Sequence, residues 1–278
     1  SSLDRKIGEL PPGSIVLCVG ACALFYLTGE FSLMKQRGSW MKSAKFPNIR
    51  IMPTLSPDVC LSKYEWFSLV RADLIRLKQG YVERSEEVNF TVPTGGEHAL
   101  YLLEDYRDKP LLSVDIETYR KTISCIGFSH DGEKALVIPF SKVDGGVVID
   151  YFSNRHDVLE VRRKVRSILL SAKRTFGQNY LFDLQFIFRE FFVHLKNCAD
   201  TMLAAHVLSP TQKKDLATSC SLYLPENRYW KDDKDGDEED DSKLVFAGGY
   251  NLWKYNALDA INTFKLYHAI LKQLDIAR

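Results

Sequence analysis

The sequence has almost no excess of charge of either sign. Its 278 residues carry 37 Lys and Arg against 36 Asp and Glu, a formal net charge of +1 at neutral pH. Proteins that wrap duplex nucleic acid need a strong basic surplus, because phosphate neutralisation supplies much of their affinity. The composition argues against that class. A groove for a few single-stranded nucleotides stays open, since it needs only local charge and stacking side chains.

Paired cysteines and long apolar runs are also missing. The six cysteines include no Cys-x-x-Cys pair, which favours reduced thiols and an intracellular location. The apolar run 15–28 is short and contains Gly20, so we expect neither a signal peptide nor a membrane partner. The length and apolar content predict a globular chain of about two domains.

Three separated motifs bring carboxylates into apolar surroundings. They are Asp115-Ile116-Glu117, Asn179-Tyr180-Leu181-Phe182-Asp183 and Tyr255-Asn256-Ala257-Leu258-Asp259. Four carboxylates packed together repel one another and raise at least one pKa, whereas divalent cations make such a cluster tolerable. Mg²⁺ and Mn²⁺ prefer oxygen ligands. Two such ions about 4 Å apart can activate water and stabilise phosphodiester cleavage. The predicted metal ligands are Asp115, Glu117, Asp183 and Asp259.

The first motif is expected at the end of a strand. Residues 111–114 are apolar, and alternation along a strand places Asp115 and Glu117 on one face. Residues 123–128 and 135–140 read as two more strands separated by the turn His130-Asp131-Gly132. This order predicts an antiparallel meander.

The second and third motifs are expected on helices. After a helix over 157–172, residues 175–179 read as a short strand that leads to a helix starting near Leu181, which places Asp183 in its first turn. Residues 254–274 have a strong helical period. Tyr255 and Asp259 are four residues apart and share a face of that helix. Asp259 can then bind metal while the Tyr255 hydroxyl orients the attacking water.

The order of the three motifs resembles that of the DEDD superfamily of 3'-5' exonucleases, tyrosine subclass, which includes proofreading domains of family A DNA polymerases and ribonuclease D. Residues 198–208 and 214–217, followed by Tyr223-Leu224, resemble segments that follow the second motif in that family. The resemblance implies an α/β fold over 97–278, ribonuclease H-like, with a mixed sheet flanked by helices. It also implies a set of five catalytic residues: Asp115, Glu117, Asp183, Tyr255 and Asp259.

The resemblance implies release of nucleoside monophosphates from single-stranded DNA 3' ends. We expect the proofreading part of a phage-type family A DNA polymerase, in a bacterial cytoplasm, with a polymerase domain as partner. Two alternatives stay open. A ribonuclease D-like exoribonuclease would use the same five residues, and a noncatalytic DNA-binding or scaffold module could retain the fold.

Other residues near the motifs are weaker candidates. Asn179 is expected to support the site through hydrogen bonds, and Asp200 reads as a helix N-cap rather than a ligand. The predicted contacts to nucleic acid are Asn179, Phe182, Phe186, Lys213 and Lys214. Both phenylalanines suit a core position equally well. The acidic stretch 231–242 reads as a solvated loop, with repulsion of a DNA backbone as the alternative.

Residues 1–83 predict a separate, smaller α/β domain, with 84–96 as a linker. Strands are expected over 14–20 and 48–52, and helices over 21–27 and 61–77. The segments Val19-Gly20-Ala21-Cys22-Ala23-Leu24, Leu27-Thr28-Gly29, Arg37-Gly38-Ser39 and Met52-Pro53-Thr54-Leu55-Ser56-Pro57 resemble the C-terminal half of a uracil-DNA glycosylase fold.

This second resemblance departs from the active glycosylases at one place. Ser56-Pro57-Asp58 stands where they usually carry His-Pro-Ser. We therefore expect a noncatalytic domain that aids DNA binding or architecture, with an unrelated α/β domain as the alternative.

Overall fold

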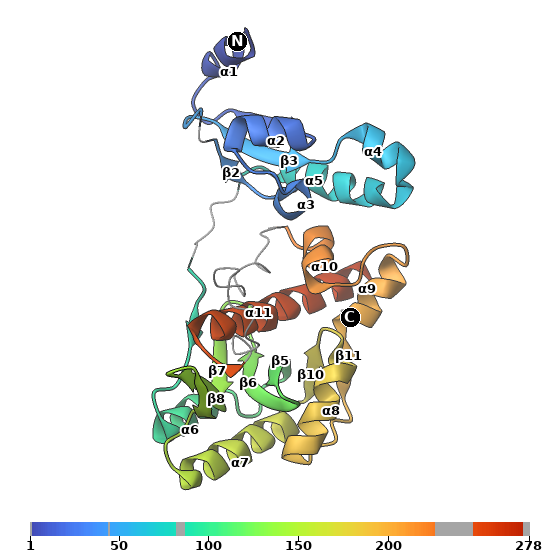
Figure 1. The fold of residues 1–278 in the computed structure, drawn as a ribbon. Coiled ribbons are helices and arrows are strands. Elements are labelled where there is room, and N and C mark those ends of the chain that lie inside the picture. The colour runs from blue at the N-terminus through green and yellow to red at the C-terminus, as the bar shows by residue number, and fades with distance from the viewer. Residues whose placement is uncertain (1, 44, 82–86, 226–246, 275–278) are drawn as a thin grey trace. The chain divides into compact units, whose positions relative to one another are not determined.

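The computed structural model describes residues 2–43, 45–81, 87–225 and 247–274. They divide into two compact units (Figure 1). The N-terminal unit comprises the described residues of 1–84, 211–213 and 217–229, and the C-terminal unit those of 85–210, 214–216 and 230–278. The acidic stretch 231–242 lies outside the described residues. None of the described helices is long and apolar enough to cross a membrane.

A six-stranded mixed sheet forms the centre of the C-terminal unit, with strand order β11-β10-β5-β6-β7-β4. The strands are β4 (Phe90–Thr91), β5 (Leu111–Tyr119), β6 (Thr122–Ser129), β7 (Ala135–Pro139), β10 (Arg174–Gly177) and β11 (Cys198–Asp200). β5, β6 and β7 pair antiparallel, which confirms the predicted meander. β4, β10 and β11 pair parallel to their neighbours. A hairpin of β8 (Ser141–Asp144) and β9 (Val147–Asp150) follows β7.

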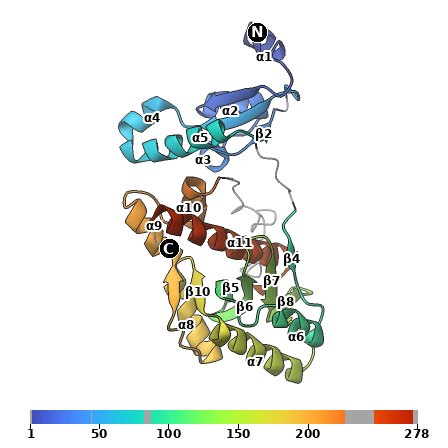
Figure 2. The ribbon, with the colours of Figure 1, turned by 180° about the vertical axis from the view of Figure 1, so that it is seen from behind.

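Helices cover both faces of this sheet (Figures 1 and 2). One face carries α6 (Gly96–Glu104), α7 (Arg155–Ser171) and α8 (Tyr180–Phe191), and the other carries α11 (Tyr250–Gln273). A shorter helix, α9 (Thr201–Leu208), follows β11. The mixed sheet flanked by helices confirms the predicted fold class.

Alternation along the strands assigns side chains to these two layers. In β6, Ile126 and Phe128 lie in the core beneath α6, α7 and α8, whereas Cys125 packs in the cluster that includes α11. In β5, Ile116 belongs to the first core. The same alternation therefore turns the carboxylates on either side of Ile116 toward α11.

The N-terminal unit contains a three-stranded sheet of order β1-β3-β2. β1 (Ile15–Val19) pairs parallel with β3 (Arg50–Thr54), and β2 (Met41–Lys42) pairs antiparallel with β3. The helices assigned to this unit are α1 (Ser2–Gly8), α2 (Ala21–Thr28), α3 (Leu33–Gln36), α4 (Pro57–Ser62), the 3-10 helix η1 (Tyr64–Trp66), α5 (Phe67–Gln79) and α10 (Leu216–Tyr223). Both predicted strands and the helix after the first strand are confirmed.

The single helix predicted over 61–77 is wrong. Lys63 has φ −132° and ψ 79°, which are not helical angles, so α4 ends before it and α5 starts at Phe67. Pro57 stands in the first turn of α4. Proline is favoured there, because the backbone N–H that it lacks would have no partner within the helix and its fixed φ suits the helix. Apolar spacing alone did not reveal this break.

The predicted domain boundaries also differ from the two units. The expected linker 84–96 contains β4, which pairs with β7, so Phe90 and Thr91 belong to the sheet. The span predicted as one domain from 97 is interrupted, because residues 211–213 and 217–225 group with the N-terminal unit. Buried guanidinium groups explain this. The Arg76 Nη2 donates to the Leu224 carbonyl at 2.9 Å, and the Arg37 Nη2 donates to the Ser221 hydroxyl at 3.0 Å.

Candidate active site

The first motif lies on β5, on the face turned toward α11. Glu117 is buried and Asp115 is half-buried. Asp115 pairs across the sheet with Gly127 of β6. From α11, the Asn256 Nδ2 donates to the Asp115 carboxylate at 2.7 Å and to its backbone carbonyl at 3.1 Å. The first motif is thus joined directly to the helix that carries the third.

The second motif occupies the turn from β10 into α8. Asn179 caps α8 with φ 54°, a left-handed conformation that asparagine tolerates better than most residues. Asp183 follows in the first turn, as predicted, and its Oδ1 accepts a hydrogen bond from the Ile116 N–H at 3.0 Å. This bond ties α8 to the backbone between the two carboxylates of the first motif.

The electrostatics of Asp183 reflect a crowded, buried position. Burial raises the pKa of its carboxyl well above the ordinary value, and the negative charges of Glu117 and Asp200 raise it further. The Ile116 N–H opposes this rise by stabilising the ionised form. Carboxyl groups with strongly raised pKa values cluster at functional sites. A cationic ligand would relieve the repulsion between such a group and its acidic neighbours.

The third motif faces the other two from α11. Tyr255 and Asp259 are both buried on the same side of the helix. Burial raises the pKa of the Tyr255 phenol, and Asp259, Glu117 and Asp115 raise it further through their charges. The phenol therefore keeps its proton at neutral pH. Together with the hydrogen bond from Ile116 to Asp183, these neighbours bring the three motifs to one place.

The four carboxylates fit divalent cations by their chemistry, since every ligand atom is a hard oxygen. Within the described part of the chain, however, no three acidic, histidine or cysteine side chains approach closely enough to hold an ion. Asp115 and Asp183 instead accept hydrogen bonds from Asn256 and Ile116. Carboxylates that repel one another favour such partners.

The predicted nucleic-acid contacts lie in varied surroundings. Phe182 is partly exposed on α8, and its ring centroid is 4.9 Å from that of Phe186, which packs against the core. The Lys214 Nζ donates to the carbonyls of Ser209 and Pro210, at the end of α9. Lys213 is exposed and belongs to the N-terminal unit. Contacts of these residues and Asn179 with nucleic acid stay predictions.

Two further residues support the motifs. Asp200 is confirmed as the N-cap of α9, because its Oδ1 accepts from the Met202 N–H at 2.8 Å. Its carboxylate also accepts from the N–H groups of Asn179 and Tyr180, at 3.1 and 2.9 Å. Asp200 thus clamps the turn of the second motif. The sequence pattern did not mark Asn256 as part of the site, although its place beside Tyr255 was the available signal.

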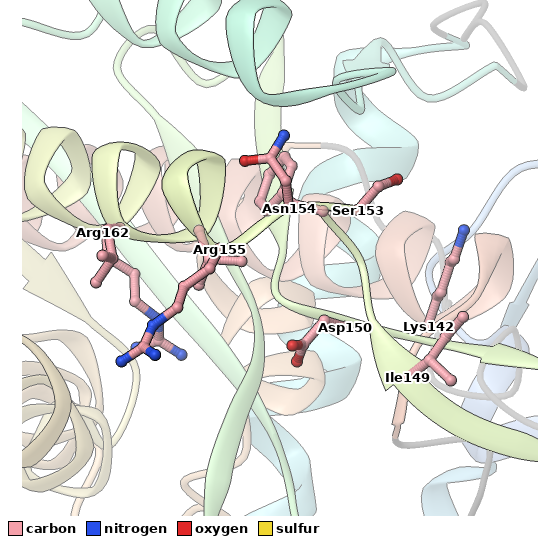
Figure 3. Close-up of a pocket in the computed structure, with 10 residues that line it drawn as sticks. Lys142, Ile149, Asp150, Ser153, Asn154, Arg155 and Arg162 are labelled. Carbon is pink, nitrogen blue, oxygen red and sulfur yellow. The ribbon is translucent and has the colours of Figure 1, made fainter.

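A separate pocket of about 750 Å³ lies between the β8–β9 hairpin and α7 (Figure 3). Arg155 and Arg162 project from α7, and Lys142 and Asp150 come from the hairpin. The pocket includes none of the residues of the three motifs. It therefore adds nothing to the carboxylate site.

Comparison with protein families places most of the chain in one of them. Residues 91–275 match the family model described as 3'-5' exonuclease. The match begins before residue 97, at β4, in agreement with the sheet. No curated protein matches the sequence.

Several solved structures are similar to this chain at low sequence identity. The EXO domain of Aedes aegypti Nibbler is 13% identical, with a TM-score of 0.50, over 72% of this chain and 94% of that chain. Escherichia coli RNase D, an exoribonuclease involved in structured RNA processing, is 16% identical with a TM-score of 0.47, over 68% of this chain. The match covers only 46% of the RNase D chain. Brucella melitensis NrnC bound to pGG is 16% identical with a TM-score of 0.44, over 69% of this chain and 83% of that chain.

Proposed function

Since this chain belongs to the 3'-5' exonuclease family, we propose that it removes nucleoside monophosphates from the 3' ends of single-stranded DNA. We further propose that it serves as the proofreading part of a DNA polymerase in DNA replication. Two divalent metal ions, Mg²⁺ or Mn²⁺, are the proposed cofactors. The N-terminal unit is proposed to be noncatalytic and to aid DNA binding or architecture.

One observation carries this proposal. Tyr255 lies within electrostatic reach of Asp115, Glu117 and Asp259, and Asp183 is hydrogen-bonded to the backbone between the first two of these. Residues from three segments distant in the sequence thus meet at one place in the fold. A scaffold module does not need four acidic side chains in a buried cluster, because their repulsion costs stability.

The proposed mechanism follows from the position of each side chain. Asp115, Glu117, Asp183 and Asp259 would hold the ions, which would supply an activated water and neutralise charge that develops on the scissile phosphate. The protonated Tyr255 phenol donates or accepts a hydrogen bond and so orients the water. Phe182, exposed beside Asp183, offers a face on which a terminal base can stack.

The choice between DNA and RNA depends on contacts near the 2'-hydroxyl. Escherichia coli RNase D, an exoribonuclease, is 16% identical to this chain. Ribonuclease D-like activity, with the same five residues, is therefore the second outcome that the experiment distinguishes.

The test is degradation of a 5'-labelled single-stranded DNA oligonucleotide with Mg²⁺ or Mn²⁺. The wild type is compared with Asp115→Ala/Glu117→Ala and with a matched control, Asp144→Ala/Asp150→Ala, which removes two exposed acids from the β8–β9 hairpin. We expect a ladder that shortens from the 3' end. It should disappear with the first variant and with a chelator, and remain with the control.

The same assay with RNA of identical sequence decides the substrate. Faster degradation of RNA would replace the proofreading proposal with the exoribonuclease. No degradation of either polymer would leave the noncatalytic module as the better account.

A separate assay addresses the N-terminal unit. We expect no release of uracil from uracil-containing DNA, because serine is a poor substitute for the histidine of active glycosylases. Uracil release that is lost in Ser56→Ala would contradict the noncatalytic assignment.

A further inference from the structure

We propose that Asn256 is a positioning residue, which packs over Gly127 and holds the Asp115 carboxylate in its working orientation. The inference rests on the proposed function, since it gives Asn256 a task toward a metal ligand. Asn256 stands between Tyr255 and Asp259 in the sequence and is not one of the predicted metal ligands.

The contacts of Asn256 define the orientation of its amide. The Nδ2 lies 2.7 Å from the Asp115 Oδ2 and 3.1 Å from the Asp115 backbone carbonyl, and both partners are acceptors. Only the NH₂ end of the amide can satisfy them. The bond to the carboxylate is charge-assisted, the stronger kind of hydrogen bond. It restrains the Asp115 side chain relative to α11 without adding charge to an already acidic site.

Gly127 makes room for this contact. It is the cross-strand partner of Asp115, and a Cβ built at this position would lie 2.3 Å from the Asn256 Oδ1. The φ of Gly127 is not positive, so the backbone does not require glycine there. The missing side chain is needed for space, because the amide of Asn256 fills the volume that any larger residue would take.

The other end of the amide argues against a purely structural role. Asn256 is fully buried, and its Oδ1 has no hydrogen-bond partner within the described residues. An unpaired buried acceptor destabilises the fold. An apolar side chain of similar size would fill the same space without that cost. The amide is therefore explained by what its NH₂ group holds.

The experiment separates packing from hydrogen bonding with Asn256→Leu, which keeps similar volume and removes the donor. We expect a melting temperature equal to or above that of the wild type. The kcat on single-stranded DNA should fall about 10- to 100-fold with little change in KM, and Mn²⁺ affinity measured without DNA should fall about 10-fold, the usual range for loss of a residue that orients a metal ligand.

Gly127→Ala tests the same contact from the opposite strand. It touches no carboxylate, yet should displace Asn256 and lower kcat and Mn²⁺ affinity in the same direction. The double variant should be no worse than the more severe single variant, because both act through one contact. Gly8→Ala is the matched control, since nothing lies within 4 Å of a Cβ at that position.

Three outcomes would overturn the proposal. They are wild-type kcat and Mn²⁺ affinity in Asn256→Leu, a collapse of its melting temperature, and losses that multiply in the double variant. The metal titration keeps this test apart from that of the proposed function. If the wild type binds Mn²⁺ but degrades no nucleic acid, weaker Mn²⁺ binding by Asn256→Leu supports the positioning role while the nuclease proposal fails.

Discussion

Tyr255 is a buried phenol that lies close to three carboxylates. Burial and three nearby carboxylates disfavour the phenolate, and its pKa therefore lies above the ordinary value of 10.0. A phenol in this state cannot serve as a general base near neutral pH. It can take part in catalysis only as a hydrogen-bonding group that orients water or substrate.

The protonation state of Tyr255 can be measured directly. Because the raised pKa favours the neutral form in the folded state, its contribution to stability is complete below about pH 10 and is lost as the pH rises further. We expect the difference in ultraviolet absorbance between wild type and Tyr255→Phe, in chelator, to show no tyrosinate below that pH. A transition near neutral pH would contradict the assignment.

Loss of a proposed metal ligand should lower kcat more than loss of the Tyr255 hydroxyl. Asp115→Ala removes stabilisation of developing charge, so kcat should fall by about 10³-fold. Tyr255→Phe keeps the ring and removes only orientation, with an expected loss of about 10²-fold. Single-turnover cleavage with saturating Mn²⁺ measures both. If the variants were equally inactive while Tyr255→Phe still bound metal, the orienting role would be wrong.

At the scale of elements, Asp200 joins the start of α8 to the start of α9. Its carboxylate accepts hydrogen bonds from Asn179, Tyr180 and Met202. One carboxylate thus accepts from N–H groups at the starts of two helices, where such groups have no partner within the helix. Because Asp183 follows directly in the first turn of α8, the position of this proposed ligand depends on the clamp.

Asp200→Ala should therefore reduce both stability and activity. Loss of the cap should cost about 1–2 kcal/mol, and displacement of Asp183 should lower kcat by about 10-fold or more. Asn154→Ala is the matched control. It removes the cap of α7, where the Asn154 side chain accepts from the Asp157 N–H, at a distance from the three motifs.

Urea unfolding and kcat, measured on both variants, separate the two effects. We expect similar losses of stability and a loss of activity in Asp200→Ala alone. Equal activity in the two variants would show that the clamp only stabilises the helices.

At the scale of the whole molecule, a buried charge network determines which unit α10 joins. The Asp73 Oδ1 lies 2.6 Å from the Arg37 guanidinium and 3.2 Å from that of Arg76, and all three side chains are buried. Burial raises the pKa of Asp73, while Arg37 opposes the rise. The Asp73 carboxylate cannot accept from every N–H group of two guanidinium groups. The Ser221 hydroxyl of α10 accepts from Arg37, and the carbonyl of Leu224, the residue after α10, accepts from Arg76.

Asp73→Asn should loosen this network, because it leaves two buried guanidinium groups without a counter-ion. The N-terminal unit should lose about 3–5 kcal/mol. Hydrogen exchange read by mass spectrometry should show faster exchange in α5 and α10, with β5, β6 and β7 unchanged. Arg71→Ala, which removes an exposed cation from the same helix, should have no such effect. Unchanged exchange in α10 would contradict the assigned role.

Sequence alone was sufficient to predict the elements that carry the carboxylates. Alternation around Ile116 and the helical spacing of Tyr255 and Asp259 are short-range properties, and they predicted the correct faces. Asp183 was placed correctly in the first turn of α8, because strand and helix signals met at Asn179. The order of the motifs also predicted the family, although DNA as the substrate remains a proposal.

Only the tertiary structure revealed the partners of those residues. That Asn256 fits over Gly127, that Ile116 donates to Asp183, and that α10 groups with the N-terminal unit all depend on contacts between segments distant in the chain. Local pattern carries no information on such contacts, since they are decided by packing volume and by the need of buried polar groups for partners. The sequence by itself determined which side chains share a face, and the folded chain decided what each face meets.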